Sequence, residues 1–174
     1  MNEGEKPPIP RVLVGAVMQQ KSRSIEELAR VASEEIRGAG FTLVRNVVVQ
    51  PDAQIIKQLI ENISNDNEAD AILLFGGAGF GPRDYACDAV NEFVERRIEG
   101  FGQAYRRLLV DEMDFGPHSW MVRATAGVFN QCLVFVMAGR PRDVQRAMQK
   151  LVVPTLPEAV ALATGRMRAV QLKA

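Results

Sequence analysis

The sequence predicts an α/β fold in which a mostly parallel sheet is covered by helices on both faces. Strand-like and helix-like segments alternate along the first half of the chain, from residue 12 to residue 94. The strand-like segments are nearly all apolar, as residues 71–75 show, and buried parallel strands have this composition. Two further strand-like runs flank Asn130-Gln131, which predicts an additional β-hairpin in the second half.

Strands and helices are predicted in alternation over the first half. The first helix has Ser24 and Glu27 in the positions of a capping box, and Gly38 and Gly40 are expected to end it. Asp52 is expected to cap the second helix. The strands are predicted at residues 12–18, 41–49 and 71–75. Apolar residues recur at helical spacing at Ile25, Leu28, Ala29, Ala32, Ile36 and Ala39, at Ile55, Ile56, Leu59, Ile60 and Ile63, and at Val90, Phe93 and Val94.

The second half is less regular. Gly100 and Gly102 are expected to break the chain before a helix at residues 105–110. Pro141 begins another predicted helix, which Pro154 is expected to stop. The remaining predicted segments are the hairpin strands at residues 121–129 and 133–137 and a short last helix at 156–163.

Length and composition predict a single domain at residues 11–174, preceded by a flexible tail at residues 1–10. Acidic and basic residues balance at 21 each, so no overall field attracts nucleic acid or an anionic membrane surface. No apolar run approaches the roughly 18 residues that a membrane span needs. Cys87 and Cys132 are too few for a disulfide framework, which predicts reduced thiols in a cytoplasmic protein.

A glycine-rich loop follows the strand at residues 71–75. Its glycines are Gly76, Gly77, Gly79 and Gly81. They are followed by Arg83, Asp84 and the start of a helix. Glycines let backbone N–H groups approach an oxygen-rich ligand, and the helix dipole adds positive potential, so the loop predicts an anion site. The alternative is a tight turn without a ligand.

Several familiar sites are excluded at this loop. No Gly-Lys-Ser/Thr follows the glycines, so it is not the P-loop of a nucleoside triphosphatase. Pro82 replaces the third glycine of the dinucleotide fingerprint, which disfavours nicotinamide binding. One histidine, His118, and two distant cysteines provide no zinc ligand cluster.

Asp52 and Asp84 each follow a predicted strand and precede a predicted helix, so a parallel sheet would bring both to the same edge. Each carboxylate could instead cap its helix. As a pair beside the loop and Arg83, they suit a magnesium–phosphate site, because Mg²⁺ prefers carboxylate and phosphate oxygens. Such a site permits phosphoryl or nucleotidyl transfer, which depends mainly on positioning and charge compensation.

The loop resembles that of the molybdenum cofactor biosynthesis family of Mog and B-type proteins, molybdopterin adenylyltransferases and their relatives. The family's Gly-Gly-Thr-Gly, spacer and Pro-Arg-Asp are similar to residues 76–84 of this chain, Gly-Gly-Ala-Gly-Phe-Gly-Pro-Arg-Asp. Further similar segments are Pro51-Asp52, residues 100–102, residues 123–127 and residues 137–141. The resemblance runs in order from about residue 11 to residue 163.

This resemblance implies a three-layer α/β/α domain like the molybdopterin-binding domain, assembled as a homo-oligomer, either a trimer or a hexamer. It implies adenylate transfer from Mg²⁺-bound ATP to molybdopterin, with a pterin and a nucleotide as small-molecule partners. Asp52 and Asp84 would then be the catalytic and metal-binding residues. The implied ligand- and phosphate-binding residues are Gly76, Gly77, Ala78, Gly79, Arg83, Arg123, Gly139 and Arg140.

The chain departs from the family pattern mainly where small hydroxyl side chains are usual. Ala78 replaces the threonine of the loop, Val122 replaces the serine before Arg123, and Arg140 replaces a serine in the later glycine loop. Each lost hydrogen bond to a charged ligand removes about 1.5–3 kcal/mol. The alternative to an adenylyltransferase is therefore a catalytically silent relative that binds a pterin, a nucleotide or a protein partner through the same fold.

Overall fold

The computed structural model describes residues 8–18, 23–112 and 116–166 of the chain. The strands are β1 (Arg11–Val17), β2 (Thr42–Val49), β3 (Ala71–Phe75), β4 (Arg96–Arg97), β5 (Thr125–Phe129) and β6 (Cys132–Met137). The helices are α1 (Arg23–Gly38), α2 (Ala53–Asn65), α3 (Ala86–Phe93), α4 (Glu99–Glu112), α5 (Pro141–Ala147) and α6 (Val153–Ala163). A 3₁₀ segment, Gly116–Met121, precedes β5, and a π-helical segment, Met148–Val152, joins α5 to α6.

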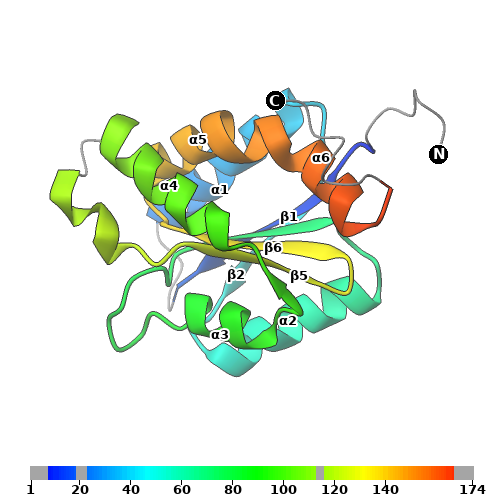
Figure 1. The fold of residues 1–174 in the computed structure, drawn as a ribbon, viewed down its shortest axis with the longest axis horizontal. Helices are drawn as coiled ribbons and strands as arrows, with labels where there is room; N and C mark the ends of the chain where they lie inside the picture. The colour runs from blue at the N-terminus through cyan, green and yellow to red at the C-terminus, as the bar shows by residue number, and fades with distance from the viewer. Residues whose placement is uncertain (1–7, 19–22, 113–115, 167–174) are drawn as a thin grey trace.

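These elements form three layers, which confirms the predicted fold class (Figure 1). The sheet lies between α1, α4, α5 and α6 on one face and α2 and α3 on the other. None of the helices within the described ranges has the length and apolar character needed to cross a membrane. The tail predicted at residues 1–10 lies outside the described residues as far as residue 7.

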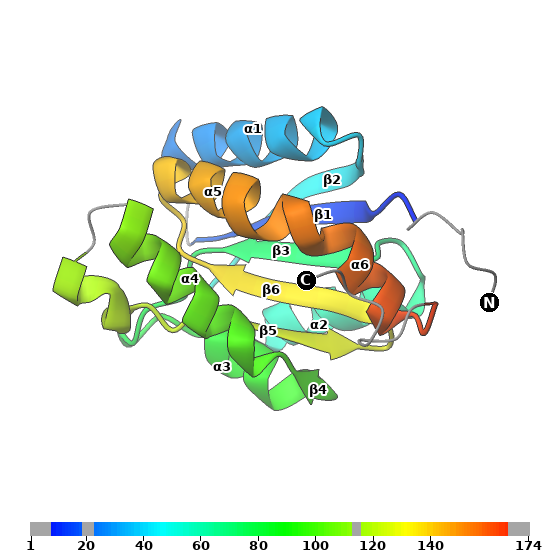
Figure 2. The ribbon, with the colours of Figure 1, turned by 45° about the horizontal axis from the view of Figure 1, so that its top comes forward.

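The sheet has six strands in the order β2-β1-β3-β6-β5-β4 (Figure 2). Strands β2, β1, β3 and β6 are parallel, whereas β5 runs antiparallel to β6 and β4 runs antiparallel to β5. Strand β3 is buried along its whole length and pairs with β1 and β6. The carboxyl ends of the four parallel strands therefore meet at one edge of the sheet.

The first-half strands lie within one residue of their predicted bounds, but the predicted capping box is misplaced. Helix α1 begins at Arg23, so Ser24 lies inside its first turn instead of preceding it. Residues 19–22 are outside the described part of the chain. The predicted cap at Asp52 is confirmed, because its Oδ1 accepts hydrogen bonds from the amides of Gln54 at 2.8 Å and Ile55 at 3.1 Å.

The prediction that Gly100 and Gly102 break the chain is wrong, because both lie in the first turn of α4. A methyl group added to Gly102 would overlap the backbone carbonyl oxygen of Ala124. Gly102 therefore allows α4 to lie against the segment that enters β5. Glycine is used here for close approach and not for ending a helix.

We expect opposite effects from alanine at these two glycines. Gly102→Ala should lower the free energy of unfolding by about 2 kcal/mol, because the carbonyl of Ala124 has to move. Gly100→Ala meets no atom within 4 Å and should raise that free energy by about 0.5 kcal/mol, since alanine loses less entropy in a helix. Urea denaturation of both variants measures the difference, and equal effects would contradict the close-approach role of Gly102.

Pro154 does not stop the helix that begins at Pro141, which corrects the second boundary prediction. The chain stays helical through the π segment into α6, where Pro154 lies in the first turn. A proline ring cannot face the carbonyl four residues earlier in a regular α-helix, and a wider π turn relieves that clash. The hydroxyl of Thr155 donates to the carbonyl of Leu151 at 2.7 Å and so occupies one carbonyl in the widened turn.

The predicted hairpin is confirmed, although its first strand is shorter than residues 121–129. Asn130 and Gln131 adopt φ values of 45° and 65°, the left-handed pair that a type I′ turn requires. The strand starts only at Thr125. Met121 belongs to the 3₁₀ segment, and residues 122–124 connect that segment to β5. Strand β4 was not predicted, and with two residues it is too short for a recognisable pattern.

Candidate functional site

The glycine loop lies at the carboxyl edge of the sheet, between β3 and α3, and its backbone requires glycine. Gly76 has φ 105°, and a methyl group there would lie 2.7 Å from the carbonyl oxygen of Val17. Gly77 has φ 65°, and a methyl group there would lie 2.8 Å from Ala86 Cβ. The loop is therefore pressed against the end of β1 and the start of α3.

The loop after β6 adjoins the same glycines. The amide of Gly76 donates to the carbonyl of Met137 at 2.9 Å. A methyl group on Gly139 would lie 3.3 Å from the Gly76 nitrogen, so the two loops are in close contact. The structure thus brings together Gly76, Gly77, Gly79 and Gly139 from the predicted set.

Four consecutive amides of the loop have no acceptor within the described ranges. These are the N–H groups of Gly77, Ala78, Gly79 and Phe80. The next amide, Gly81, donates to Asp84 Oδ2 at 2.8 Å. Backbone N–H groups rarely remain without partners unless water or a ligand accepts from them, so this run of donors is suited to an anion.

Arg123 holds the glycine loop in place through hydrogen bonds to its backbone carbonyls. Its amide donates to the carbonyl of Ala78 at 2.7 Å, and its Nε donates to the carbonyl of Gly79 at 2.6 Å. One terminal nitrogen donates to the carbonyl of Asp84 at 2.9 Å, and both terminal nitrogens contact the carboxylate of Asp88 at 2.8 and 3.0 Å. The hydrogen bond with Asp88 raises the pKa of Arg123 above its ordinary value.

These contacts orient two of the donors. In a trans peptide, the N–H of one residue points opposite to the C=O of the residue before it. Because the carbonyls of Ala78 and Gly79 point to Arg123, the amides of Gly79 and Phe80 point away from it. Arg123 is among the predicted ligand- and phosphate-binding residues, and the structure shows its guanidinium group in contact with the backbone of the loop.

The two predicted carboxylates have different surroundings. Asp84 lies in the loop, where its Oδ2 accepts from Gly81 while its Oδ1 has no hydrogen-bond partner within the described residues. The residue before α3 is Tyr85, so Asp84 is not the N-cap that the alternative interpretation required. Asp52 is exposed and caps α2 through Oδ1. The capping interpretation thus holds for Asp52 and fails for Asp84.

Both carboxylates lie beyond the carboxyl ends of parallel strands, but not beside each other in the sheet. Strand β1 separates β2 from β3, which sets the two strand ends about 10 Å apart at the usual strand spacing. Among the described residues, no three His, Cys, Asp or Glu side chains gather in a metal-binding group. A Mg²⁺ ion here would take most of its ligands from phosphate oxygens and water, as Mg²⁺ commonly does.

The two other predicted arginines lie at the rim. Arg83 is exposed next to Asp84. Arg140 has a side chain that is 60% exposed, and its Nε donates to the buried carboxylate of Asp143. Arg140 is thus held at the start of α5, beside Gly139.

Two positions that usually carry hydroxyl groups are apolar and buried in this chain. Ala78 is 5% exposed and Val122 is 8% exposed. At Ala78 the backbone carbonyl still accepts from the Arg123 amide, and the Ala78 amide has no acceptor in the described ranges, so the substitution removes only a side-chain donor. The backbone part of the site therefore does not depend on the missing hydroxyls.

Sequence reasoning missed Asp88, which pairs with Arg123 across the loop. The only signal for it was its spacing of four residues from Asp84, which is common on any helix. It also missed a pair of exposed aromatic rings, Phe80 in the loop and Trp120 in the 3₁₀ segment.

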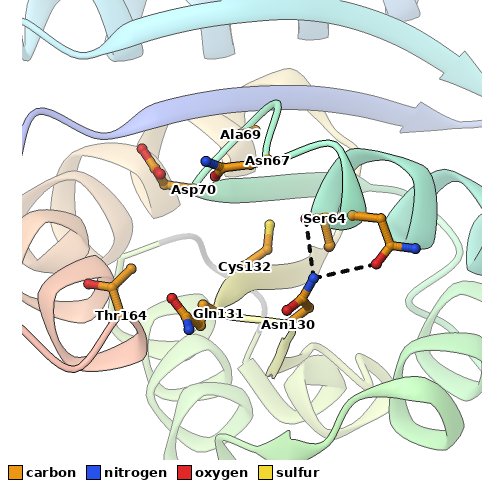
Figure 3. Close-up of a pocket in the computed structure, with 9 residues that line it drawn as sticks. Ser64, Asn67, Ala69, Asp70, Asn130, Gln131, Cys132 and Thr164 are labelled. Carbon is orange, nitrogen blue, oxygen red and sulfur yellow. Dashed lines mark hydrogen bonds between the residues drawn. The ribbon is translucent and has the colours of Figure 1, made fainter.

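A separate polar cavity of about 230 Å³ lies at the opposite edge of the sheet (Figure 3). Ser64, Asn130 and Cys132 contribute to its wall, and Ser64 Oγ is buried with no hydrogen-bond partner in the described ranges. The one carboxylate in its wall, Asp70, is paired with Arg11 at 2.8 Å. The glycine loop is therefore the better candidate for an anionic ligand.

Cys87 and Cys132 are both free and buried, as expected for reduced thiols. Burial raises the pKa of each thiol to about 12. An unfolded thiol titrates near a pKa of about 8.5, so the unfolded chain loses these protons first as pH rises. The free energy of unfolding should therefore fall between about pH 9 and pH 12. Below about pH 8.5 the two protonated thiols contribute their full stabilisation to the folded state.

Urea denaturation at several pH values measures this dependence. Other groups titrate in the same range, so the matched control is the Cys87→Ala, Cys132→Ala double variant. The decline above pH 9 should be shallower in this variant, and identical slopes would contradict the assignment to the thiols.

Comparison with known proteins identifies a family for most of the chain. Residues 17–158 match the family described as probable molybdopterin binding domain. The chain is 30% identical over 156 residues to molybdenum cofactor biosynthesis protein B of Bacillus subtilis (strain 168), covering 90% of this chain and 91% of the relative. It is 32% identical over 140 residues to the protein of the same name from Staphylococcus aureus (strain Mu50), covering 80% of this chain and 79% of the relative.

A solved structure has the same fold. The crystal structure of a molybdenum cofactor biosynthesis protein B superposes with a TM-score of 0.84 at 24% identity, covering 92% of this chain and 99% of that chain.

Proposed function

The chain belongs to the family of probable molybdopterin binding domains, and on that basis we propose that it acts in molybdenum cofactor biosynthesis and binds molybdopterin at the glycine loop. The observation that supports this proposal is the run of four amides, from Gly77 to Phe80, that have no acceptor in the described ranges, of which those of Gly79 and Phe80 point away from Arg123. A run of amide donors of this kind suits the terminal phosphate of a pterin.

The finer proposal is adenylyl transfer from ATP. In this reaction an oxygen of the molybdopterin phosphate attacks the α-phosphorus of ATP, and pyrophosphate leaves. Asp84 would hold Mg²⁺ through Oδ1, with Asp52 on the nucleotide side, and the bound ion would neutralise charge on the phosphates. The loop amides would orient the attacking phosphate, and Arg83 and Arg140 would compensate charge at the rim.

Pyrophosphate release measures this proposal directly. Purified protein is incubated with molybdopterin, ATP and magnesium, and a matched reaction contains EDTA. We expect pyrophosphate to form only with magnesium and only when both substrates are present. Tight binding of molybdopterin without turnover would instead identify a binding protein that lacks adenylyltransferase activity.

We also propose that the protein is a cytoplasmic homo-oligomer. The outer strand β2 has one neighbour in the sheet and presents Val48 with 42% exposure, next to a largely apolar cavity between β2 and α1. An open, β-branched strand edge favours pairing with another chain. Sedimentation equilibrium tests this, and a monomer at micromolar concentration would refute it.

A further inference from the structure

Two aromatic side chains lie exposed beside the glycine loop and parallel to each other. The ring centroids of Phe80 and Trp120 are 6.0 Å apart, and their planes differ by 8°. Phe80 is 60% exposed and Trp120 is 65% exposed. Large apolar rings at this exposure contribute little to the core, and exposed apolar patches commonly mark binding sites.

The position of both rings is fixed by the same contacts that shape the loop. Phe80 follows Gly79, whose carbonyl accepts from Arg123, and precedes Gly81, whose amide donates to Asp84. Trp120 lies three residues before Arg123 in the chain, and the Arg123 amide is bonded to the Ala78 carbonyl. Arg123 therefore joins the segment that carries Trp120 to the loop that carries Phe80.

Phe80 also carries the last of the four amides that have no acceptor in the described ranges, and this amide points away from Arg123. A ligand whose phosphate binds those amides would thus place its neighbouring atoms near the aromatic pair. Flat nitrogen heterocycles stack well on such rings, because every face of the heterocycle is a π surface.

We propose that Phe80 and Trp120 form a stacking platform for the planar heterocycle of a phosphorylated ligand, either the pterin or the adenine ring. The proposal rests on the proposed function for the location of the phosphate, and adds the residues that recognise the ring. Phe80 and Trp120 would hold the ring of the ligand in place and would take no part in the chemistry at the phosphorus atom.

The composition of the chain provides a direct probe, since Trp120 is its single tryptophan. The fluorescence of the protein therefore reports on this platform alone when tryptophan is excited. Magnesium–ATP and magnesium–tripolyphosphate form a matched pair of probes that differ in the adenosine group. A 6-hydroxymethylpterin phosphate tests the pterin ring in the same way.

We expect at least one ring-bearing probe to quench Trp120 emission to saturation, whereas tripolyphosphate should bind without quenching. Calorimetry should show that Phe80→Ala and Trp120→Ala each lower the affinity for that probe by about 10-fold and leave the affinity for tripolyphosphate unchanged. Trp120→Phe should retain most of the affinity. The matched control is Tyr85→Ala, which removes an exposed aromatic ring outside the stacked pair and should have no effect.

The outcomes separate the two proposals. Equal affinity for ATP, the pterin phosphate and tripolyphosphate would overturn the platform and leave the phosphate site standing. No binding of any probe would overturn both. A blue shift of Trp120 emission that grows with protein concentration alone would show that a second copy covers the rings, which would also overturn the platform.

Discussion

Replacing Asp84 by asparagine is expected to lower the rate of magnesium-dependent pyrophosphate release by about 100-fold or more. Asparagine can still accept the Gly81 amide that Asp84 Oδ2 accepts at 2.8 Å, so the loop should keep its shape. What is lost is the negative charge on Oδ1, the atom that has no hydrogen-bond partner in the described ranges. The assay compares kcat of the variant with that of the unchanged protein at saturating substrates.

Two controls make this result specific. Urea denaturation of Asp84→Asn should give nearly the same free energy of unfolding as the unchanged protein. Asp66→Asn removes an exposed carboxylate at the end of α2 and should leave the rate unchanged. A rate within threefold of normal for Asp84→Asn, at normal stability, would remove Asp84 from the catalytic proposal.

Arg123→Ala should have the largest effect on stability. The substitution removes the side-chain hydrogen bonds to two loop carbonyls and to Asp88. Hydrogen bonds from a charged donor contribute about 1.5–3 kcal/mol each, and the partly exposed Asp88 pair adds little, so we expect a loss of about 3 kcal/mol. Phosphate binding should weaken as well, because the Gly79 carbonyl loses its side-chain donor and the Phe80 amide on the same peptide loses its fixed direction.

Urea denaturation and calorimetry with tripolyphosphate measure the two effects. Arg107→Ala is the matched control, since Arg107 forms an exposed pair with Asp111 and its side chain is 84% exposed. This control should change stability by less than about 0.5 kcal/mol. Arg123→Lys should not restore the loop, because an ammonium group cannot reach the acceptors that the planar guanidinium spans. A stability loss from Arg123→Ala no greater than that of the control would refute the role of Arg123 in fixing the loop.

The parallel half of the fold could be predicted because local pattern and final environment agree there. The apolar run at residues 71–75 became a strand buried on both faces, and Asp52 capped its helix as its position suggested. Asn130-Gln131 formed the predicted turn even though the usual Asn-Gly was absent.

The errors at Gly102 and Pro154 arise where the folded chain overrides a local signal, through a packing contact at Gly102 and a widened helical turn at Pro154. Gly102 looks like a helix breaker in the sequence, and only its contact with the Ala124 carbonyl shows why glycine lies inside a helix. Pro154 is typical of a helix end in the sequence, yet the π-helical segment before it accommodates the proline ring. Local propensity is a weak prior in such places.

The sequence indicates the candidate site only as a backbone feature. Glycines marked the loop, but the direction of its amides depends on Arg123, which lies more than 40 residues away in the chain. No spacing rule connects Arg123 to Gly79 or Asp88. The same holds for Trp120, whose partner Phe80 is distant in sequence and close in space.

The central position of β3 also has a consequence for the order of folding. Its residue 71 pairs with residue 12 on one side and with residue 133 on the other, so the second pairing has to wait for a much later part of the chain. Until β6 is synthesised, one edge of a fully apolar strand stays open to other chains. Ribosome-bound chains that stop before residue 132 should therefore aggregate on release, and chaperones should bind them at this edge.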